Sequence, residues 1–270
     1  MSNRFIVPLF ALMAVTCSSI GLAQTWNYPG MDREAFKSLP PGGPAPPRDL
    51  TGTWDASGGG IGGSGQAAER AAAQTPFTSL GEQMMRANKP GNGPSSVSVA
   101  DINDPLSTIG DPTGFPRLLT FELRPFQVVH TPNQVLMLYM FEKRWRVIWT
   151  DGRALPEDPD PRWYGYSVGR WEDDYTFVVN SNGTDDRTWL DNSGNPHSVD
   201  LRVEERYRRV NQNTLELTVT VDDPQVYTEP WIARNRLPLR LLPPETDLME
   251  MIPSASEAQA YREFMSSQAR

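Results

Sequence analysis

Residues 158–207 read DPDPRWYGYSVGRWEDDYTFVVNSNGTDDRTWLDNSGNPHSVDLRVEERY. Aromatic and charged residues alternate here along segments with the composition of β-strands. Successive side chains of a strand point to opposite faces, so a charged residue in phase with apolar ones must lie in a core or a cavity. The stretch therefore predicts a β-rich fold with polar groups on its inner side.

Short β-patterns separated by turn residues continue on both sides of this stretch. We expect strands at 50–55, 126–131, 134–141, 145–150, 164–171, 176–180, 197–210, 214–221 and 227–239. An antiparallel meander of about eight to ten strands commonly closes into a barrel, because closure removes exposed edges. The predicted fold class is mainly β, with the meander closing into one barrel.

The remaining segments predict an arm, an insertion and a tail around this barrel. The proline-rich stretch 24–48 cannot bury much surface and is expected to form an extended arm. A single barrel domain is expected at 49–242, with a helix and loop insertion at 58–117 that holds one or two short helices. The tail, 243–270, is expected to contain a short helix at 257–266.

The first residues have the pattern of a secretory signal peptide. Arg4 precedes an apolar run from Phe5 to Cys17, and small residues follow up to Ala23. The run is shorter than the roughly 20 residues of a membrane span. Cleavage after Ala23 is predicted, and hence a periplasmic or secreted protein without a stable membrane span. Acylation at Cys17 is the alternative, although residues 14–16 match the usual lipoprotein pattern poorly.

Composition narrows the chemistry. Cys17 is the only cysteine, so cleavage after Ala23 would leave no thiol for a disulfide, a metal site or a nucleophile. The net charge is −8, and nucleic-acid binding is not expected because the arginines of 202–209 alternate with acids. No metal is predicted, because the two histidines, His130 and His197, lack ligand spacing. Calcium at the acids of 151–160 is a weaker alternative to a rigid proline-rich connection.

Two resemblances bear on fold. LTGTW at 50–54 resembles the Gly-x-Trp opening of lipocalins and fatty-acid-binding proteins, which implies a calycin-like barrel. Most of the mature chain resembles an uncharacterised family of exported bacterial β-rich proteins. The motifs that carry it are DLTGTW, GFPR at 114–117, DPDPRWYGYSVGRWE, TWLD at 188–191, PHS at 196–198, ERYRR at 205–209 and YTEPW at 227–231. Many members of that family have a cysteine shortly before GFPR, where this chain has Gly110 and Asp111.

The strand at 197–210 supplies the strongest site candidates. His197, Glu205 and Tyr207 share the odd-numbered face with three aliphatic residues. A buried carboxylate without a partner costs several kcal/mol, so Glu205 needs a partner or a wet cavity. In the simpler interpretation, His197 is exposed after Pro196 and Glu205 pairs with an arginine.

The strand at 164–172 has two possible orientations. If Tyr164 and Tyr166 face inward, they line a cavity and Arg170 can pair with Glu205; if they face outward, Trp171 fills the core. Trp149 shares one face with Trp145 and Val147, where core packing is the default and stacking on a flat ligand the alternative. Trp189 and Trp231 fall in irregular segments and are expected to plug a barrel mouth or cap a pocket.

These patterns support three functional hypotheses. The first is a barrel that binds a small hydrophobic or aromatic molecule in an internal cavity, with Tyr164, Tyr166, Arg170, Trp149, Trp189 and Trp231 as ligand-binding residues. The second is an isomerase, lyase or hydrolase without a cofactor. It would use His197 as acid–base, Glu205 or Asp191 to orient it, and Tyr166, Tyr207 and Arg170 to position the substrate. The third is an envelope interaction module that uses the N-terminal arm.

Overall fold

The computed structural model describes residues 38–56, 75–121, 123–252 and 254–268. The predicted signal peptide, the arm before residue 38 and the glycine-rich loop 58–65 lie outside these ranges. In the described part, no helix has both the length and the apolar character that crossing a membrane requires.

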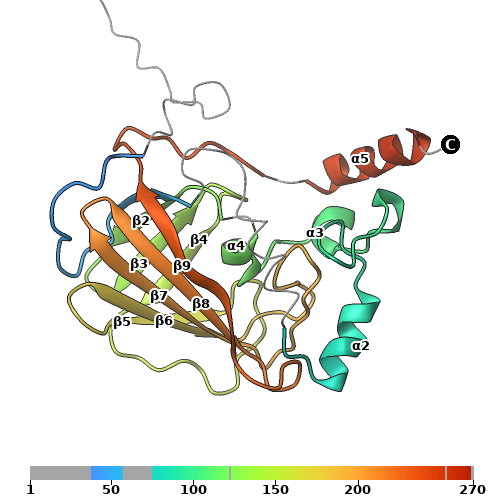
Figure 1. Cartoon of the computed structure of the whole chain (residues 1–270), viewed down its shortest axis with the longest axis horizontal. Helices are drawn as coiled ribbons and strands as arrows, with labels where there is room; N and C mark the ends of the chain where they lie inside the picture. Colours follow the sequence, from blue (N-terminus) through green and yellow to red (C-terminus); the bar gives the residue numbers. More distant parts are fainter. Residues whose placement is uncertain (1–37, 57–74, 122, 253, 269–270) are drawn as a thin grey trace, which may run out of the picture.

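Nine strands form one closed barrel in chain order (Figure 1). The strands are β1 (Gly52–Asp55), β2 (Phe126–His130), β3 (Gln134–Tyr139), β4 (Trp145–Trp149), β5 (Tyr166–Trp171), β6 (Thr176–Asn182), β7 (Arg202–Asn211), β8 (Thr214–Asp222) and β9 (Trp231–Leu241). The mainly β fold and the closed barrel are confirmed. β1 pairs with both β2 and β9, which closes the sheet.

One strand pair departs from the predicted antiparallel meander. β4 and β5 run parallel and share a single bridge, Trp149 with Val168, whereas every other neighbouring pair is antiparallel. The proline-rich connection 150–165 is the reason, because it carries the chain back to the starting end of β4 before β5 begins.

Helices lie to one side of the barrel (Figure 1). They are α2 (Ser79–Ala87), the 3-10 turn η2 (Val99–Asp101), α3 (Pro105–Thr108), α4 (Arg117–Thr120) and α5 (Ala255–Gln268). Thr78 caps α2, since its side-chain oxygen accepts from the Gly81 N–H at 3.1 Å. α2 falls inside the segment predicted to be helical, and α5 contains the predicted tail helix. The short helical turns between residues 89 and 117 have no counterpart in the sequence pattern.

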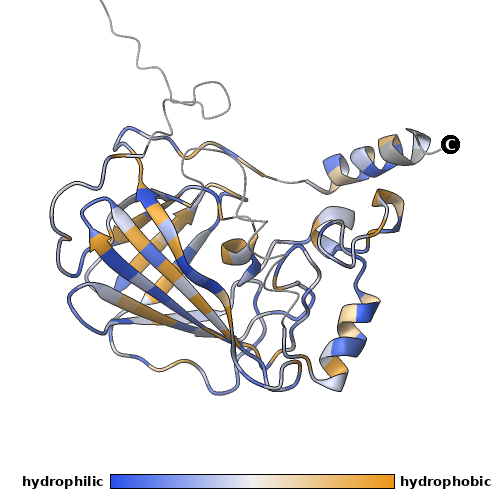
Figure 2. Cartoon of the chain, viewed as in Figure 1, coloured by the Kyte–Doolittle hydropathy of each residue, from blue (hydrophilic) through white to orange (hydrophobic). Residues whose placement is uncertain are grey.

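The core follows the period of two along the strands. Orange and blue alternate along the ribbons in Figure 2, as expected for a sheet with one buried face. On β7, the inward residues Val203, Glu205, Tyr207 and Arg209 are buried, and the residues between them are more exposed. The buried side chains Trp54, Phe126, Met137, Phe177, Tyr207 and Leu217 pack together inside the barrel.

The orientation of β5 is settled by burial. Ser167 and Trp171 point into the barrel, where the Trp171 and Phe177 ring centroids lie 5.2 Å apart, and Arg170 is exposed on the outer face. A neighbouring strand approaches closely at Gly169, since a Cβ there would lie 2.4 Å from Cζ of Phe177 in β6. The alternative in which Arg170 pairs with Glu205 inside the barrel is therefore wrong.

Candidate functional site

A buried ion pair occupies the barrel interior beside β4 and β5. Arg146 of β4 donates two hydrogen bonds to the Glu205 carboxylate, at 2.9 and 2.7 Å. The same guanidinium donates to the hydroxyls of Ser167 at 2.9 Å and Ser181 at 3.2 Å. Tyr207 donates to Glu205 Oε2 at 2.8 Å. Glu205 thus receives three donors, which offset the cost of burying its charge.

Electrostatics keep Arg146 charged. Burial alone would lower the pKa of Arg146, but Glu205 together with Tyr139 and Tyr207 outweighs burial, and the pKa is raised. Burial, together with Glu205 and against the opposing charge of Arg146, raises the pKa of the nearby Tyr139 to about 12 and that of Tyr207 well above its ordinary value. Both tyrosines therefore stay protonated near neutral pH, and Tyr207 remains a donor to Glu205.

β4 and β5 are joined at only one point, and we call the boundary between these two strands the seam. It lies beside the ion pair. β4 pairs with β3 through even-numbered residues, since the Tyr139 N–H donates to Arg144 O at 2.7 Å and the Thr150 N–H to Asn133 O at 2.9 Å. The main-chain groups of Trp145, Val147 and Trp149 must then face β5. Of these three residues, only Trp149 has a bridge across the seam.

A loop lies on the inner side of the seam and keeps its two sides apart. The main chain of Phe115 donates to Trp163 O at 2.9 Å, and the Phe115 ring centroid lies 4.0 Å from the Arg146 guanidinium. Glu142 accepts from the Thr113 N–H at 2.7 Å and from the Tyr164 hydroxyl. These contacts insert residues 113–115 between the turn before β4 and the segment that leads into β5.

The open seam forms a cleft of about 450 Å³ on the outer face, which we call the seam cleft. Arg146 and Ser167 lie at its floor, and residues 154–156 form one wall. Its aromatic and cationic lining comprises Trp145, Trp149, Tyr164, Tyr166, Arg153 and Arg162. Trp145 is 65% exposed, which is unusual because tryptophan has the largest side chain and is mostly buried in proteins. Its ring is therefore open to a ligand.

Two arginines of the cleft differ in how their charge is compensated. The Arg153 guanidinium lies 3.5 Å from the Trp149 ring centroid and pairs with Asp151 at 2.6 Å. Arg162 lies 4.1 Å from the Tyr166 ring centroid and has no acidic partner among the described residues. The cleft therefore combines flat aromatic surfaces with an uncompensated positive charge, which suits an aromatic ligand carrying an anion.

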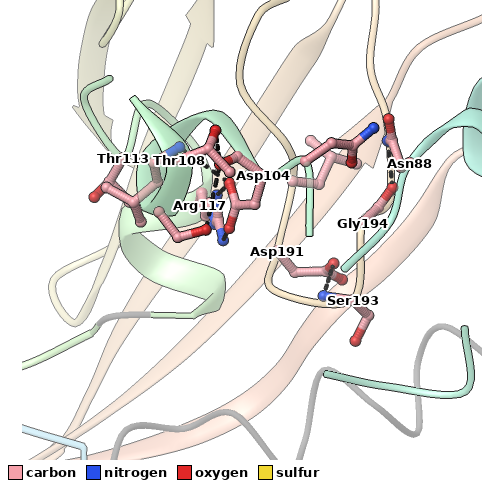
Figure 3. A network of polar contacts seen from close by, with 12 residues as sticks. Asn88, Asp104, Thr108, Thr113, Arg117, Asp191, Ser193 and Gly194 are labelled. Atoms are coloured by element: carbon pink, nitrogen blue, oxygen red, sulfur yellow. Dashed lines mark hydrogen bonds and ion pairs between the residues drawn. The ribbon is translucent and has the colours of Figure 1, made fainter. Parts of the chain in front are cut away.

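A buried loop, which we call the cap, lies between the end of β6 and the start of β7. Residues 188–197 are all buried, although they form neither helix nor strand. Asp191 accepts from the Ser193 N–H at 2.9 Å and from Asn195 Nδ2 at 2.6 Å, and Asn88 Nδ2 donates to Gly194 O at 2.7 Å (Figure 3). Buried irregular backbone needs such partners, so these polar side chains stabilise the loop.

A second ion pair fixes this cap from the side of α4. Arg117 donates to both carboxylate oxygens of Asp104, at 2.8 and 2.6 Å (Figure 3). Trp189, which is 5% exposed, has its ring centroid 5.6 Å from the Arg117 guanidinium. Trp231 opens β9 and meets Tyr227 edge-on at 5.5 Å. Both tryptophans thus pack in or beside the cap and do not line the seam cleft.

The proposed catalytic residues fall into three separate groups. Glu205 and Tyr207 contact each other beside Arg146. Asp191 accepts hydrogen bonds from its own loop, and His197 contacts Thr188 elsewhere in the cap. β7 begins at Arg202, so the predicted strand start at His197 is wrong. Because His197 lies outside the strand, it does not share a strand face with Glu205.

His197 is nevertheless buried, and its two hydrogen-bond partners are uncharged. Nδ1 donates to Ser198 O at 3.0 Å, which leaves Nε2 to accept from the Thr188 hydroxyl at 2.9 Å. Burial lowers the pKa of His197, so the ring stays uncharged at neutral pH. No described hydrogen bond joins it to a carboxylate or a tyrosine, which is the contact that acid–base catalysis would require.

Three predicted ligand-binding residues meet in the seam cleft. Trp149, Tyr164 and Tyr166 line it, whereas Arg170 points outward on β5 beyond it. Sequence reasoning missed Arg146, Arg153 and Arg162. The parity rule could not have identified Arg146, because it takes the apolar face of Trp145, Val147 and Trp149 as the buried one and so places Arg146 outside.

In comparisons with known proteins, no family model, no curated protein and no solved structure matches the chain. The resemblance to exported bacterial proteins therefore stays a prediction.

Proposed function

We propose that the protein is exported and binds a small aromatic molecule with an anionic group in the seam cleft. The observation that carries this proposal is the exposed aromatic lining of the cleft beside Arg162, a cation without an acidic partner in the described part of the chain. An aromatic ring would stack on the exposed Trp145 or replace the Arg153 guanidinium on Trp149, and a carboxylate or similar group would pair with Arg162.

This proposal places the ligand at the surface seam, unlike the internal cavity expected from the sequence. The barrel interior is filled by fully buried side chains such as Trp54, Phe177 and Tyr207. The exposed Trp145 and the half-buried Trp149 and Tyr166 lie on the outer face. Neither alternative function has a comparable observation, since His197 lacks a carboxylate partner and the N-terminal arm before residue 38 is not described.

The test uses 3-phenylpropionate and its neutral analogue 3-phenylpropanamide, titrated into the full protein and followed by NMR. We expect the acid to bind more tightly than the amide. Arg162→Ala should weaken binding of the acid roughly 10-fold, since a charge-assisted hydrogen bond contributes about 1.5–3 kcal/mol. Trp149→Ala should weaken both compounds, because it removes the stacking surface.

Arg170→Ala is the matched control, because Arg170 is also an exposed outward arginine, on β5, but does not line the cleft. It should leave both affinities unchanged. Equal binding of acid and amide, or equal effects of the two arginine variants, would contradict the proposal. The same is true if neither compound binds at millimolar concentration.

A further inference from the structure

The edge of β4 that faces the seam cleft offers main-chain hydrogen bonds. Odd-numbered residues of β4 face β5, and the β4–β5 ladder consists of the Trp149–Val168 bridge alone. Among the described hydrogen bonds, none pairs the main-chain N–H or C=O of Trp145 or Val147 across the seam. A short strand edge with free donors and acceptors therefore lies along one wall of the cleft.

Unpaired strand edges recognise one kind of ligand well. An extended peptide adds to such an edge through main-chain bonds, while pockets beside the edge read its alternate side chains. The seam cleft has both features, because the free edge at Trp145 and Val147 lies beside the aromatic and cationic lining. A rigid aromatic acid alone would leave the main-chain groups of these two residues unused.

Side-chain alternation gives the ligand a pattern. Residues i and i+2 of an extended chain point to the same side. With its backbone along β4, a peptide would direct these two side chains to the outer lining, where Trp149 offers a stacking surface and Arg162 a charge. The uncompensated Arg162 favours an acidic side chain at one position, and the exposed rings favour an aromatic one at the other.

We infer that the natural ligand of the seam cleft is an extended peptide with an aromatic and an acidic residue two positions apart, paired through its backbone to the edge of β4. This inference rests on the proposed function and names its ligand class. A second copy of the protein, pairing edge to edge, is the competing occupant.

The experiment compares acetyl-Phe-Ala-Glu-Ala-amide with two versions, one N-methylated at Phe and Glu and the other at both Ala residues. Alternate N–H groups of a strand face opposite sides, so one version blocks the donors that face β4. That version should bind at least about 5-fold more weakly than the unmodified peptide, because it lacks two main-chain hydrogen bonds.

A protein variant gives an independent readout. Val147→Pro removes the N–H that faces the seam, and Val147→Ala is the control for the lost side chain. Val147→Pro should weaken peptide binding relative to Val147→Ala, whereas the two variants should bind 3-phenylpropionate equally. If both methylated peptides bind like the unmodified one while the acid still depends on Arg162, the inference fails and the proposed function stands. If neither peptide nor acid binds, the proposed function itself fails.

Analytical ultracentrifugation of the free protein tests the competing occupant. We expect the unsubstituted protein and the Val147→Pro variant to sediment as the same species. A dimer that the Val147→Pro substitution dissociates would overturn the inference in favour of pairing between copies.

Discussion

At the residue scale, Arg146 and Glu205 show how a charge is accommodated inside a barrel. Both side chains are almost fully buried, at 2% and 0% exposure, and lie 2.7 Å apart. Two serines and Tyr207 add further hydrogen bonds around them, while Arg146 Nε is buried without a partner among the described residues. A pair of this kind adds little net stability compared with apolar residues, yet breaking it is costly because one charge is left without a partner.

Arg146→Met and Glu205→Leu should each lower the free energy of unfolding by about 3–5 kcal/mol, since each leaves a buried charge behind. The double variant should lose much less than the sum, because both charges are removed together. Urea denaturation of the four proteins measures this coupling. Arg236→Met is the control, since Arg236 pairs with Glu216 while 64% exposed and should cost less than about 1 kcal/mol. Additive losses would show that the pair does not act as a unit.

Parity along β7 is enough to predict that Glu205 and Tyr207 point inward, and the structure has both buried. The partner of Glu205 cannot be predicted in the same way, because parity fixes a face but not which strand lies opposite. Arg170 and Arg146 both sit on strands of this barrel, and only burial shows that Arg146 is inside. The predicted strand start at His197 is wrong because the chain turns between residues 198 and 201 and β7 begins only at Arg202.

At the element scale, the seam results from one irregular connection. The stretch 150–165 contains several prolines, which cannot donate to a ladder, and it returns the chain for a parallel pairing. The prolines are visible in the sequence, but they predict only a rigid connection. The direction of β5 depends on where that connection ends, which is a tertiary property. The aromatic face of β4, given a core role by default, is the outer lining of the cleft for this reason.

Proline scanning of β4 tests this arrangement. Val147→Pro should lower the free energy of unfolding by no more than about 1–2 kcal/mol beyond Val147→Ala, because the Val147 N–H faces the open seam. Ile148→Pro should cost about 3 kcal/mol or more beyond Ile148→Ala, because Ile148 pairs with Val135 of β3. Urea denaturation compares the four variants. Similar losses for the two prolines would mean that Val147 is also paired in the folded protein.

At the scale of the whole molecule, closure of the barrel follows from the number and spacing of its β-patterns, and it requires no knowledge of the site. The interior can be assigned from alternation because one face of each strand is buried. The cap cannot, because residues 188–197 are buried without any periodic pattern, and their partners come from distant segments such as Asn88. Irregular buried loops depend on side-chain hydrogen bonds that only the folded arrangement brings together.

The C-terminal tail has one part that packs against the barrel and another part, α5, that does not. Met251 O accepts from the Glu142 N–H at 2.6 Å, and Phe141 forms a bridge with Met251. By contrast, α5 lies away from the barrel and beside α3 (Figure 1), where Arg262 donates to Thr108 O at 3.4 Å next to a cleft of about 820 Å³. Its side chains Tyr261 and Phe264 are 56% and 59% exposed, so the helix buries little apolar surface.

A chain ending at Ile252 should therefore keep its free energy of unfolding within about 0.5 kcal/mol of the full protein. A chain ending at Leu242 should lose about 1–3 kcal/mol, because the buried Glu142 turn loses its main-chain partner and its cover. Urea denaturation midpoints and slopes measure both effects, since the slope reports the surface exposed on unfolding. Should the chain ending at Ile252 lose several kcal/mol or unfold, α5 would have to be counted as part of the same cooperative unit as the barrel.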